Sequence, residues 1–389
     1  MARRIILEVI WVAMLPISLL AHLAGYRRVP IKIDRIGHLA SEFDCFLKEL
    51  KLGRRPRRRW FVVASRGQVA NACLLEYWKL HVAVVQQPVI ALLLEAMARH
   101  GVMVIDISRN MPVLKGTANY YSVLAQWGDR PPLLTLGEEH RERGWITLEN
   151  IGVPREAWFV AIHAREPGFS AHDESAHAHR NSDIRKLIPA IREIRRRGGW
   201  VFRMGDPSMQ PLPTVDGVID YAHHSSRSDW MDVFLCAEAR FFVGNTSGLY
   251  LLSTVFGTPC ALANVIPSSH LAFAPTDLSI LKLIWSNPEN RYLRFDEIFE
   301  RSVSEYRFAD LFAGEGLRVE ENSEEELSGL VTEMLDRVEG RFKATLDDEA
   351  LQQRFLSFFR PGHFGYGVAG RAGSDFLRRH RQLLRCDFF

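Results

Sequence analysis

Several polar and charged residues follow directly on apolar segments of this sequence, as side chains at strand ends would. His163 ends the apolar stretch 157–163, and Arg165 comes two positions later. Because side chains two residues apart on a strand point the same way, His163 and Arg165 are predicted to share a face. The planar guanidinium of an arginine can hold phosphate oxygens through two parallel hydrogen bonds. Arg165 is therefore a candidate phosphate ligand, and an ion pair with Glu166 is the alternative.

A second cluster follows the apolar segment 200–202. Arg203 is a candidate contact for an anionic ligand, and Asp206 is a candidate acceptor for a ribose or sugar hydroxyl. A plain glycine-aspartate turn at 205–206 explains the same residues, so both interpretations stay open. Further along, Tyr221 precedes the third cluster and is expected to line the same site.

The third cluster lies between a predicted strand, 240–243, and a predicted helix, 247–256. Its residues are small and polar, and they begin at Gly244: Asn245, Thr246, Ser247 and Gly248. Hydroxyl groups beside the N–H groups of a helix start form an anion site. The lysine of a P-loop is missing, which favours a diphosphate over a magnesium-bound triphosphate. A simply capped turn is the alternative.

A fourth cluster, 34–38, follows the predicted strand 29–33. A glycine at a strand-to-helix turn lets the backbone approach a ligand, and here Gly37 is followed by His38. An imidazole has an unperturbed pKa of about 6.5, so His38 is a candidate general base. Asp34 is a second candidate for that role. The alternative is that Gly37 and His38 only begin the helix.

Missing motifs narrow the chemistry. The chain has no D-x-D, no G-x-S-x-G and no H-E-x-x-H sequence. His172, His177 and His179 share one loop without a second group of ligands at standard spacing, so neither a metal nor another cofactor is predicted. The basic run 54–59 has no interleaved aromatic residues, which argues against nucleic acid. It fits an anionic lipid surface or a solvated loop.

The elements that must position these residues alternate between strand and helix. In the first part, strands are expected at 29–33, 60–64, 82–85 and 102–105, with helices between them. A second series begins at the strand 157–163 and runs through strands 200–203, 240–243 and 259–263. Apolar runs joined by helices predict doubly wound parallel sheets, whose ligands bind at the carboxyl ends of the strands.

Length and composition agree with this organisation. The chain has 389 residues, of which 47% are hydrophobic and 24% charged, and its formal net charge is +3. These values exclude a disordered or collagenous chain, and they predict about two or three domains. Five scattered cysteines without a C-x-x-C pair favour a reducing compartment. We expect a hydrophobic N-terminal helix at 1–28, α/β domains at 29–152 and 153–345, and a helical extension at 346–389.

The N-terminal segment departs from the soluble average. An apolar run at 5–24 is long enough to cross a bilayer as a helix, but it contains Glu8, Pro16 and His22. Arginines lie on both sides, so the positive-inside rule gives no orientation. Membrane association, a helix packed on the first domain and a cleaved signal peptide all remain open.

The motifs, in their fixed order, resemble those of a bacterial glycosyltransferase family found with surface-polysaccharide and secondary-metabolite loci. The resemblance covers about 31–384 and is strongest over 160–265. It also extends, more distantly, to heptosyltransferases and to fucosyltransferases with a His-x-Arg motif. The matching segments are 163–169 (HAREPGF), 180–184 (RNSDI), 203–206 (RMGD), 217–221 (GVIDY), 228–232 (SDWMD) and 244–248 (GNTSG).

This resemblance implies a GT-B fold, in which two Rossmann-like domains face a cleft and the second holds a nucleotide-sugar donor. By that similarity Arg165, with the segment 246–248, pairs with the donor diphosphate, and His38 takes the position of an aspartate base in heptosyltransferases. The implied activity is metal-independent, inverting glycosyl transfer to a carbohydrate, lipid-linked or small-molecule acceptor. A nucleotide-sugar 2-epimerase and a non-catalytic membrane-associated scaffold are the alternatives. The implied location is cytoplasmic, with a peripheral or anchored position at the inner membrane left open.

Overall fold

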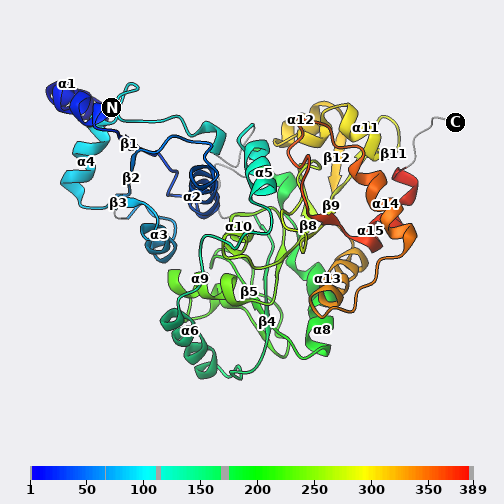
Figure 1. The fold of residues 1–389 in the computed structure, drawn as a ribbon. Coiled ribbons are helices and arrows are strands. Elements are labelled where there is room, and N and C mark those ends of the chain that lie inside the picture. The colour runs from blue at the N-terminus through cyan, green and yellow to red at the C-terminus, as the bar shows by residue number, and fades with distance from the viewer. Residues whose placement is uncertain (1, 66, 111–114, 168–174, 385–389) are drawn as a thin grey trace. The chain divides into compact units, whose positions relative to one another are not determined.

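The computed structural model describes residues 2–65, 67–110, 115–167 and 175–384 (Figure 1). The chain divides into two compact units, Met1–Leu134 and Thr135–Phe389. Each unit contains a parallel sheet flanked by helices, which confirms the predicted mixed α/β class.

The first unit is built on a three-stranded parallel sheet with the order β1-β2-β3. Val29 follows β1 and donates its N–H to Phe61 O of β2 at 2.8 Å, so the chain stays beside β2 beyond the end of the strand. The strands are β1 (Tyr26–Arg28), β2 (Arg59–Val63) and β3 (Ala83–Val85), and the helices are α1 (Ala2–Leu23), α2 (Ile36–Lys51), α3 (Ala72–Lys79), α4 (Pro88–Met97), η1 (Ser108–Asn110) and α5 (Lys115–Trp127).

Two strands predicted for this unit differ from those observed. The first strand is Tyr26–Arg28 rather than 29–33, because Pro30 has no N–H to donate to a ladder. The segment 102–105 forms only an isolated bridge, between Arg28 and Val104. The left-handed backbone of Met103, with a φ of 54°, interrupts extended pairing there.

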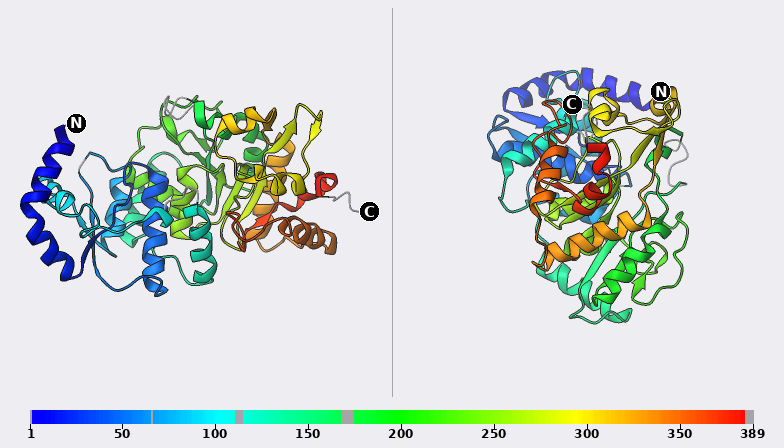
Figure 2. Two further views of the ribbon diagram at one scale, coloured as in Figure 1. Left: turned by 90° about the horizontal axis from the view of Figure 1, so that it is seen from above. Right: turned by 90° about the vertical axis from the view of Figure 1, so that its right-hand side faces the viewer.

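The N-terminal helix packs on this unit. Figure 2 shows α1 as one long helix that lies beside α4. Met14 and Ala21 pack against a cluster of buried residues from β2, α4 and the segment that follows α4: Phe61, Val63, Ala91, Met97, Ala98 and Met103. The helix therefore contributes to the core of the first unit along one of its faces.

The second unit is built on a seven-stranded sheet with the order β13-β9-β8-β7-β4-β5-β6, and every neighbouring pair is parallel. The chain starts in the middle at β4, passes outward to β5 and β6, and then returns to β7 on the other side. The strands are β4 (Phe159–His163), β5 (Trp200–Arg203), β6 (Val218–Ile219), β7 (Phe242–Gly244), β8 (Cys260–Val265), β9 (Leu278–Leu281) and β13 (Arg371–Ala372).

Helices pack on this sheet in groups. Helix α8 packs with α13, and α9 packs with α6 and α10. The helices of the unit are α6 (Glu138–Asn150), α8 (Ile188–Arg196), α9 (Asp229–Glu238), α10 (Gly248–Phe256), α11 (Phe295–Glu300), α12 (Ala309–Gly314), α13 (Glu324–Val338), α14 (Leu346–Leu356) and α15 (Ser374–Arg379), with 3₁₀ turns η2 (Ala178–Arg180), η3 (Ile184–Leu187), η4 (Tyr221–His223), η5 (Val303–Glu305) and η6 (Arg381–Leu384). A small antiparallel sheet joins β10 (Leu283–Ser286), β11 (Arg291–Tyr292) and β12 (Leu317–Glu320).

The compact division differs from the boundary expected near residue 152. Helix α6 packs against α9, so the segment from Thr135 onward belongs with the second unit. The C-terminal segment 346–384 belongs there too, because β13 pairs with β9 and α15 packs on α13.

Candidate anion site at the strand switch point

The second unit has its topological switch point between β4 and β7, where the chain changes direction across the sheet. In open α/β sheets ligands bind at the carboxyl ends of the strands at such a point. His163 at the end of β4 is in register with Gly244 at the end of β7. A Cβ atom on Gly244 would lie 2.4 Å from His163 O, so only glycine lets the two strand ends come this close.

His163 is held as a neutral imidazole. Its Nδ1 lies 3.1 Å from Met204 O, a contact in which Nδ1 donates, and the residue is only 5% exposed. Burial lowers the pKa of His163 to about 4, and the nearby Arg203 and Arg165 act in the same direction. His163 therefore fixes the ends of β4 and β5 without adding positive charge.

Asn245 organises the loops around this point. Its Oδ1 accepts from the backbone N–H of Arg165 at 3.1 Å. Its Nδ2 donates to Arg180 O at 3.0 Å and to Ser182 Oγ at 3.3 Å. One buried amide thus joins the loop after β4, the segment 180–182 and the loop after β7.

Cationic side chains surround the same segments. The Arg165 guanidinium donates to Asn181 Oδ1 and, at 3.2 Å, to His177 O. The Arg180 guanidinium donates to Thr246 O. Arg180 therefore lies at the loop that begins α10, where the helix dipole favours an anion, and Arg165 is held next to it in the chain through Asn181.

The remaining residues of the 244–248 loop complete the anion site. Ser247 is the N-cap of α10 but makes no side-chain cap hydrogen bond, and its buried Oγ has no hydrogen-bond partner among the described residues. Thr246 Oγ1 donates to Ile266 O at 3.1 Å, so this hydroxyl fixes the loop. Gly248 begins α10. The Ser247 hydroxyl and the first turn of α10 are the groups here best placed to receive phosphate oxygens.

Lys282 is a member of the site that the sequence analysis missed. It lies between β9 and β10, is 3% exposed, and donates from Nζ to Asn181 O at 2.6 Å. Burial lowers its pKa to about 8, and Lys186 acts in the same direction while Glu321 opposes the shift. A single lysine within an otherwise apolar segment (LSILKLIW) was the signal that could have identified it.

His270, which is paired with Tyr250, lies close enough to Arg180 and Arg307 for their charges to act on it. The pair shares a hydrogen bond of 2.8 Å between Tyr250 Oη and His270 Nε2. Burial lowers the pKa of His270 to about 3, and Arg307 and Arg180 lower it further. Several cations therefore act on one small region of the second unit.

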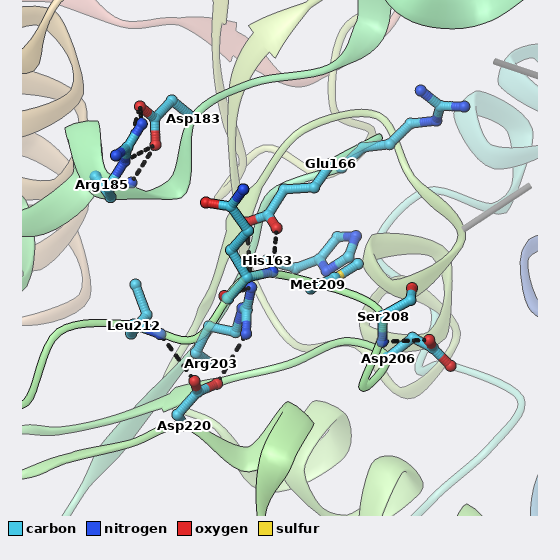
Figure 3. Close-up of polar contacts among 12 residues, drawn as sticks. His163, Glu166, Asp183, Arg185, Arg203, Asp206, Ser208, Met209, Leu212 and Asp220 are labelled. Atoms are coloured by element: carbon cyan, nitrogen blue, oxygen red, sulfur yellow. Dashed lines mark hydrogen bonds and ion pairs between the residues drawn. The ribbon is translucent and has the colours of Figure 1, made fainter. Parts of the chain in front are cut away.

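Arg203 does not belong to this anion site. Figure 3 shows its side chain between two carboxylates, Glu166 and Asp220. Arg203 is 0% exposed, and it also donates to Gln210 O at 2.9 Å. The expected contact with an anionic ligand is thus corrected: Arg203 neutralises the buried Glu166 and the partly buried Asp220, and the same pairing removes Glu166 as a partner for Arg165.

Tyr221 is also structural. It is 0% exposed, and its hydroxyl donates to Asp232 Oδ1 at 2.8 Å and accepts from Ser228 N at 3.0 Å. Burial raises the pKa of Asp232 to about 6. The expectation that Tyr221 lines the ligand site is corrected, because its hydroxyl instead orders the start of α9. Ser228 is the N-cap of that helix by position, but its side chain makes no cap hydrogen bond.

Asp206 forms the turn that was its alternative interpretation. Its Oδ1 accepts from Ser208 N at 2.9 Å (Figure 3). This hydrogen bond lowers the pKa of Asp206 against the effect of partial burial, so the group is a carboxylate at neutral pH. Through its second carboxylate oxygen, Asp206 stays a proposed acceptor for a sugar or ribose hydroxyl.

In the first unit, His38 and Glu42 form a pair one helical turn apart on α2. His38 Nδ1 lies 2.6 Å from Glu42 Oε1, while Glu42 Oε2 accepts from Lys32 N at 2.9 Å. Glu42 is 0% exposed, whereas the His38 side chain is 19% exposed. A buried carboxylate that holds one ring nitrogen directs the other nitrogen to act as the proton acceptor.

Asp34 occupies a separate position. It is exposed and lines a cavity of about 380 Å³ with Lys32, Ser65 and Gln68, among other residues. The structure shows no histidine partner for Asp34 comparable to the His38–Glu42 pair among the residues it describes.

Among the described residues, no group of three or more His, Cys, Asp and Glu side chains is arranged to hold a metal ion. His177 and His179 lie with ring centroids 6.3 Å apart, and His172 lies outside the described residues. Burial lowers the pKa of His179 to about 3.

No protein-family profile matches this chain, and no curated protein matches its sequence. Among solved structures, a glycosyl transferase family 9 protein from Veillonella parvula DSM 2008 is similar at 12% identity, over 61% of this chain and 80% of that one, with a TM-score of 0.40. The dodecameric iron-containing glycosyltransferase TibC from enterotoxigenic E. coli H10407 is similar at 14% identity, over 61% of this chain and 58% of that one, with a TM-score of 0.33. The heptosyltransferase TibC in complex with ADP-D-beta-D-heptose is similar at 13% identity, over 62% of this chain and 58% of that one, with a TM-score of 0.34. This chain thus spans less than two thirds of the TibC chains.

Proposed function

We propose that this protein is a glycosyltransferase that moves a sugar from a nucleoside-diphosphate-sugar to an acceptor hydroxyl. The observation that carries the proposal is the cationic site at the β4–β7 switch point. Arg165 and Lys282 both donate to Asn181, and the neighbouring Arg180 donates to the loop that begins α10, where the Ser247 hydroxyl has no partner among the described residues. This arrangement suits a leaving diphosphate, and the motif resemblance in the same segments points to the same donor class.

In the proposed reaction the acceptor oxygen attacks the anomeric carbon of the donor sugar. The bond between that carbon and the β-phosphate oxygen breaks, and the nucleoside diphosphate leaves with the bonding electrons. Arg165, Arg180 and Lys282 stabilise the charge that develops on the diphosphate, without a metal ion. The proton of the acceptor hydroxyl goes to Nε2 of His38, the ring nitrogen that does not contact Glu42, and the buried Glu42 carboxylate stabilises the resulting imidazolium.

One displacement of this kind inverts the anomeric configuration. We propose inversion because the chain offers a histidine base that can activate the acceptor hydroxyl for one direct displacement. The acceptor is a carbohydrate, a lipid-linked saccharide or a small molecule, and we propose a cytoplasmic location where nucleotide sugars are made.

Nucleotide binding gives the first test. Thermal unfolding is measured with ADP, GDP, UDP and dTDP, with the corresponding monophosphates, and with nucleotide sugars that include ADP-heptose. We expect one diphosphate to raise the unfolding temperature more than its monophosphate does. The Arg165→Ala variant should lose this effect, while Arg155→Ala, whose side chain forms an exposed ion pair with Glu142, should keep it. Equal responses of both variants would contradict the diphosphate site.

Product analysis gives the second test. The selected donor is incubated with and without candidate acceptors, in the presence of a chelator, and the products are followed by NMR. Transfer that persists with chelator and inverts the anomeric centre is expected. An epimerised nucleotide sugar formed without acceptor would support the 2-epimerase instead, and the absence of any nucleotide response would support the scaffold.

A further inference from the structure

Helix α1 has two faces of different character. Leu7 and Ser18 are buried against the first unit, and Met14 and Ala21 pack on its core cluster. The opposite face is apolar and exposed: Val9 and Val12 are each 64% exposed and Leu20 is 67% exposed. Ile5, Ile6, Ile17, Leu19 and Leu23 continue this outer face.

Polar contacts hold α1 flat against the unit over most of its length. Glu8 Oε1 lies 2.7 Å from Arg99 Nη2, and Glu8 Oε2 lies 2.9 Å from His100 Nε2. Fourteen residues further on, Met103 N donates to His22 Nδ1 at 3.0 Å. These contacts span roughly 20 Å of helix. A bilayer-spanning position would break all of them and would leave Glu8 in hydrocarbon.

Helix α4 also carries exposed apolar side chains. It packs beside α1, and its outward residues Val89 and Ile90 are 62% and 49% exposed, with Leu93 next to them on the following turn. An apolar surface built from two neighbouring helices exceeds the scattered exposed residues that are normal for a protein in water.

Basic residues lie at both ends of this apolar surface. Arg4 is exposed near the start of α1. At the other end, Arg58 lies 3.9 Å from a Cβ placed on Gly25, and the Arg59 guanidinium lies 5.1 Å above the Tyr26 ring. Arg57, Arg58 and Arg59 are exposed.

The first two arginines of the basic run 54–59 make contacts within the first unit, unlike the exposed arginines 57–59. Arg54 donates to Gln126 Oε1 at 2.5 Å, and Arg55 pairs with Glu49 at 2.6 Å. The run is thereby divided into an inner pair that holds the fold and an outer group beside the end of α1. The outer charges are placed to meet lipid phosphates.

We propose that α1 and α4 dock in the plane of an anionic lipid leaflet, with the outer face of α1 in the acyl boundary and the outer arginines on the headgroups. An amphipathic helix flanked by basic residues binds a membrane surface in this way, and an exposed aromatic such as Tyr26 fits the interfacial region. This docking does not depend on the proposed reaction, because every residue that carries it lies in the first unit.

Vesicle binding tests the docking with the full-length chain. Sedimentation is measured with phosphatidylcholine vesicles that contain or lack phosphatidylglycerol. We expect binding to the anionic vesicles that weakens with salt and falls about tenfold or more in the double variant Val9→Asp, Val12→Asp. Leu80→Asp is the matched control, because Leu80 is 79% exposed on the same unit but lies outside both helices.

Two results would overturn the docking. One is the absence of binding to either vesicle type by a monomeric protein. The other is a dimer in solution that the double variant dissociates, since a second copy of the chain would then cover the apolar surface. Equal thermal unfolding of the double variant and the parent establishes that the comparison concerns a folded protein.

Cysteine labelling separates in-plane docking from a spanning helix. Single substitutions Arg4→Cys and Arg57→Cys place thiols near the two ends of α1 in protein reconstituted into vesicles by detergent removal. A membrane-impermeant maleimide added outside should label both positions to equal extents, above the background of the parent cysteines. Protection of one position in all outward-facing molecules would show a spanning helix and overturn the in-plane arrangement.

Discussion

At the scale of single residues, burial separates arginines that look alike in the sequence. Arg203 and Arg185 both pair with carboxylates in the second unit, and Figure 3 draws both. Arg203 is fully buried between Glu166 and Asp220, whereas the Arg185 side chain is 65% exposed beside Asp183. Removing one partner of a buried pair leaves an uncompensated charge, while an exposed pair contributes little.

Arg203→Met should therefore lower the free energy of unfolding by about 3–5 kcal/mol. Arg185→Met should leave the unfolding midpoint unchanged. Urea denaturation of both variants, followed by intrinsic fluorescence, measures the difference. Equal midpoints would show that the Arg203 network contributes no more than an exposed ion pair.

Lys282 allows a prediction about pH at the anion site. Because its pKa is lowered to about 8, its positive charge is lost as the pH rises through that value. The affinity for the selected nucleoside diphosphate should fall between pH 7.5 and 9.5, on the order of tenfold if one charged contact is lost. Calorimetry across this range checks it.

Lys282→Met should bind the diphosphate more weakly at neutral pH and should lose the pH dependence above pH 7.5. Lys186→Met should keep the pH dependence but move its midpoint to higher pH, because Lys186, which pairs with Glu321 at 3.2 Å, lowers the pKa of Lys282. An unchanged pH profile in Lys282→Met would assign the titration to another group.

At the scale of elements, glycines set how closely the strands and helices approach. Gly244 lets β7 lie against the carbonyl of His163, where a Cβ would clash at 2.4 Å with backbone. Gly144 plays a comparable part between α6 and α9, since a Cβ there would lie 2.2 Å from the Phe234 ring. Close packing of this kind cannot accept even one methyl group without a shift.

Gly244→Ala should destabilise the protein by about 1–3 kcal/mol, because β4 and β7 must move apart. The shift would also disturb the anion site, so diphosphate affinity should fall with stability. Gly314→Ala on α12 is the matched control, since nothing lies within 4 Å of its Cβ position. Thermal unfolding of the two variants compares them directly, and equal loss in both would rule out a special role for the β4–β7 contact.

At the scale of the whole molecule, the free energy of unfolding in acid depends on buried titratable groups whose contributions oppose one another. Burial holds the pKa of His163 at about 4, so the unfolded chain binds a proton near pH 6.5 that the folded chain does not. His179 and His270, with pKa values of about 3, act in the same direction. Asp232 and Asp277 act in the opposite direction, since burial raises their pKa values to about 6.

The contribution of His163 can be isolated by substitution. Stability tied to a lowered histidine pKa is present above pH 6.5 and is lost as the pH falls towards 4, by roughly 3 kcal/mol for His163. In His163→Asn, whose amide can still donate to Met204 O, this loss should disappear. Chemical denaturation at pH 7, 5.5 and 4 measures it, and parallel pH profiles for variant and parent would contradict a neutral buried imidazole.

The local part of this fold could be predicted from the sequence. Apolar runs predicted β5 at its observed bounds and β2 within one residue at each end. For β4 the predicted end is correct, and the predicted start is two residues too early. The S-x-x-E sequence at 323–326 has the pattern of a capping box, and this box is present at the start of α13, with Glu326 Oε2 accepting from Ser323 N at 2.8 Å. Strand patterns and caps depend on residues a few positions apart, so they are readable without knowledge of the rest of the chain.

The assembly of the candidate site needed the tertiary structure. The sequence by itself determined the α/β class, the helix start at 247–248 and the placement of Arg165 at a strand end. Only the fold decided that Arg203 and Tyr221 are buried and that Lys282 joins the loop of Arg165, because Lys282 and Asn181 lie 101 positions apart in the chain. The fold also divided the basic run 54–59 between the interior and the end of α1. Burial and distant partners set the charge and availability of a side chain, and neither is encoded in its immediate neighbours.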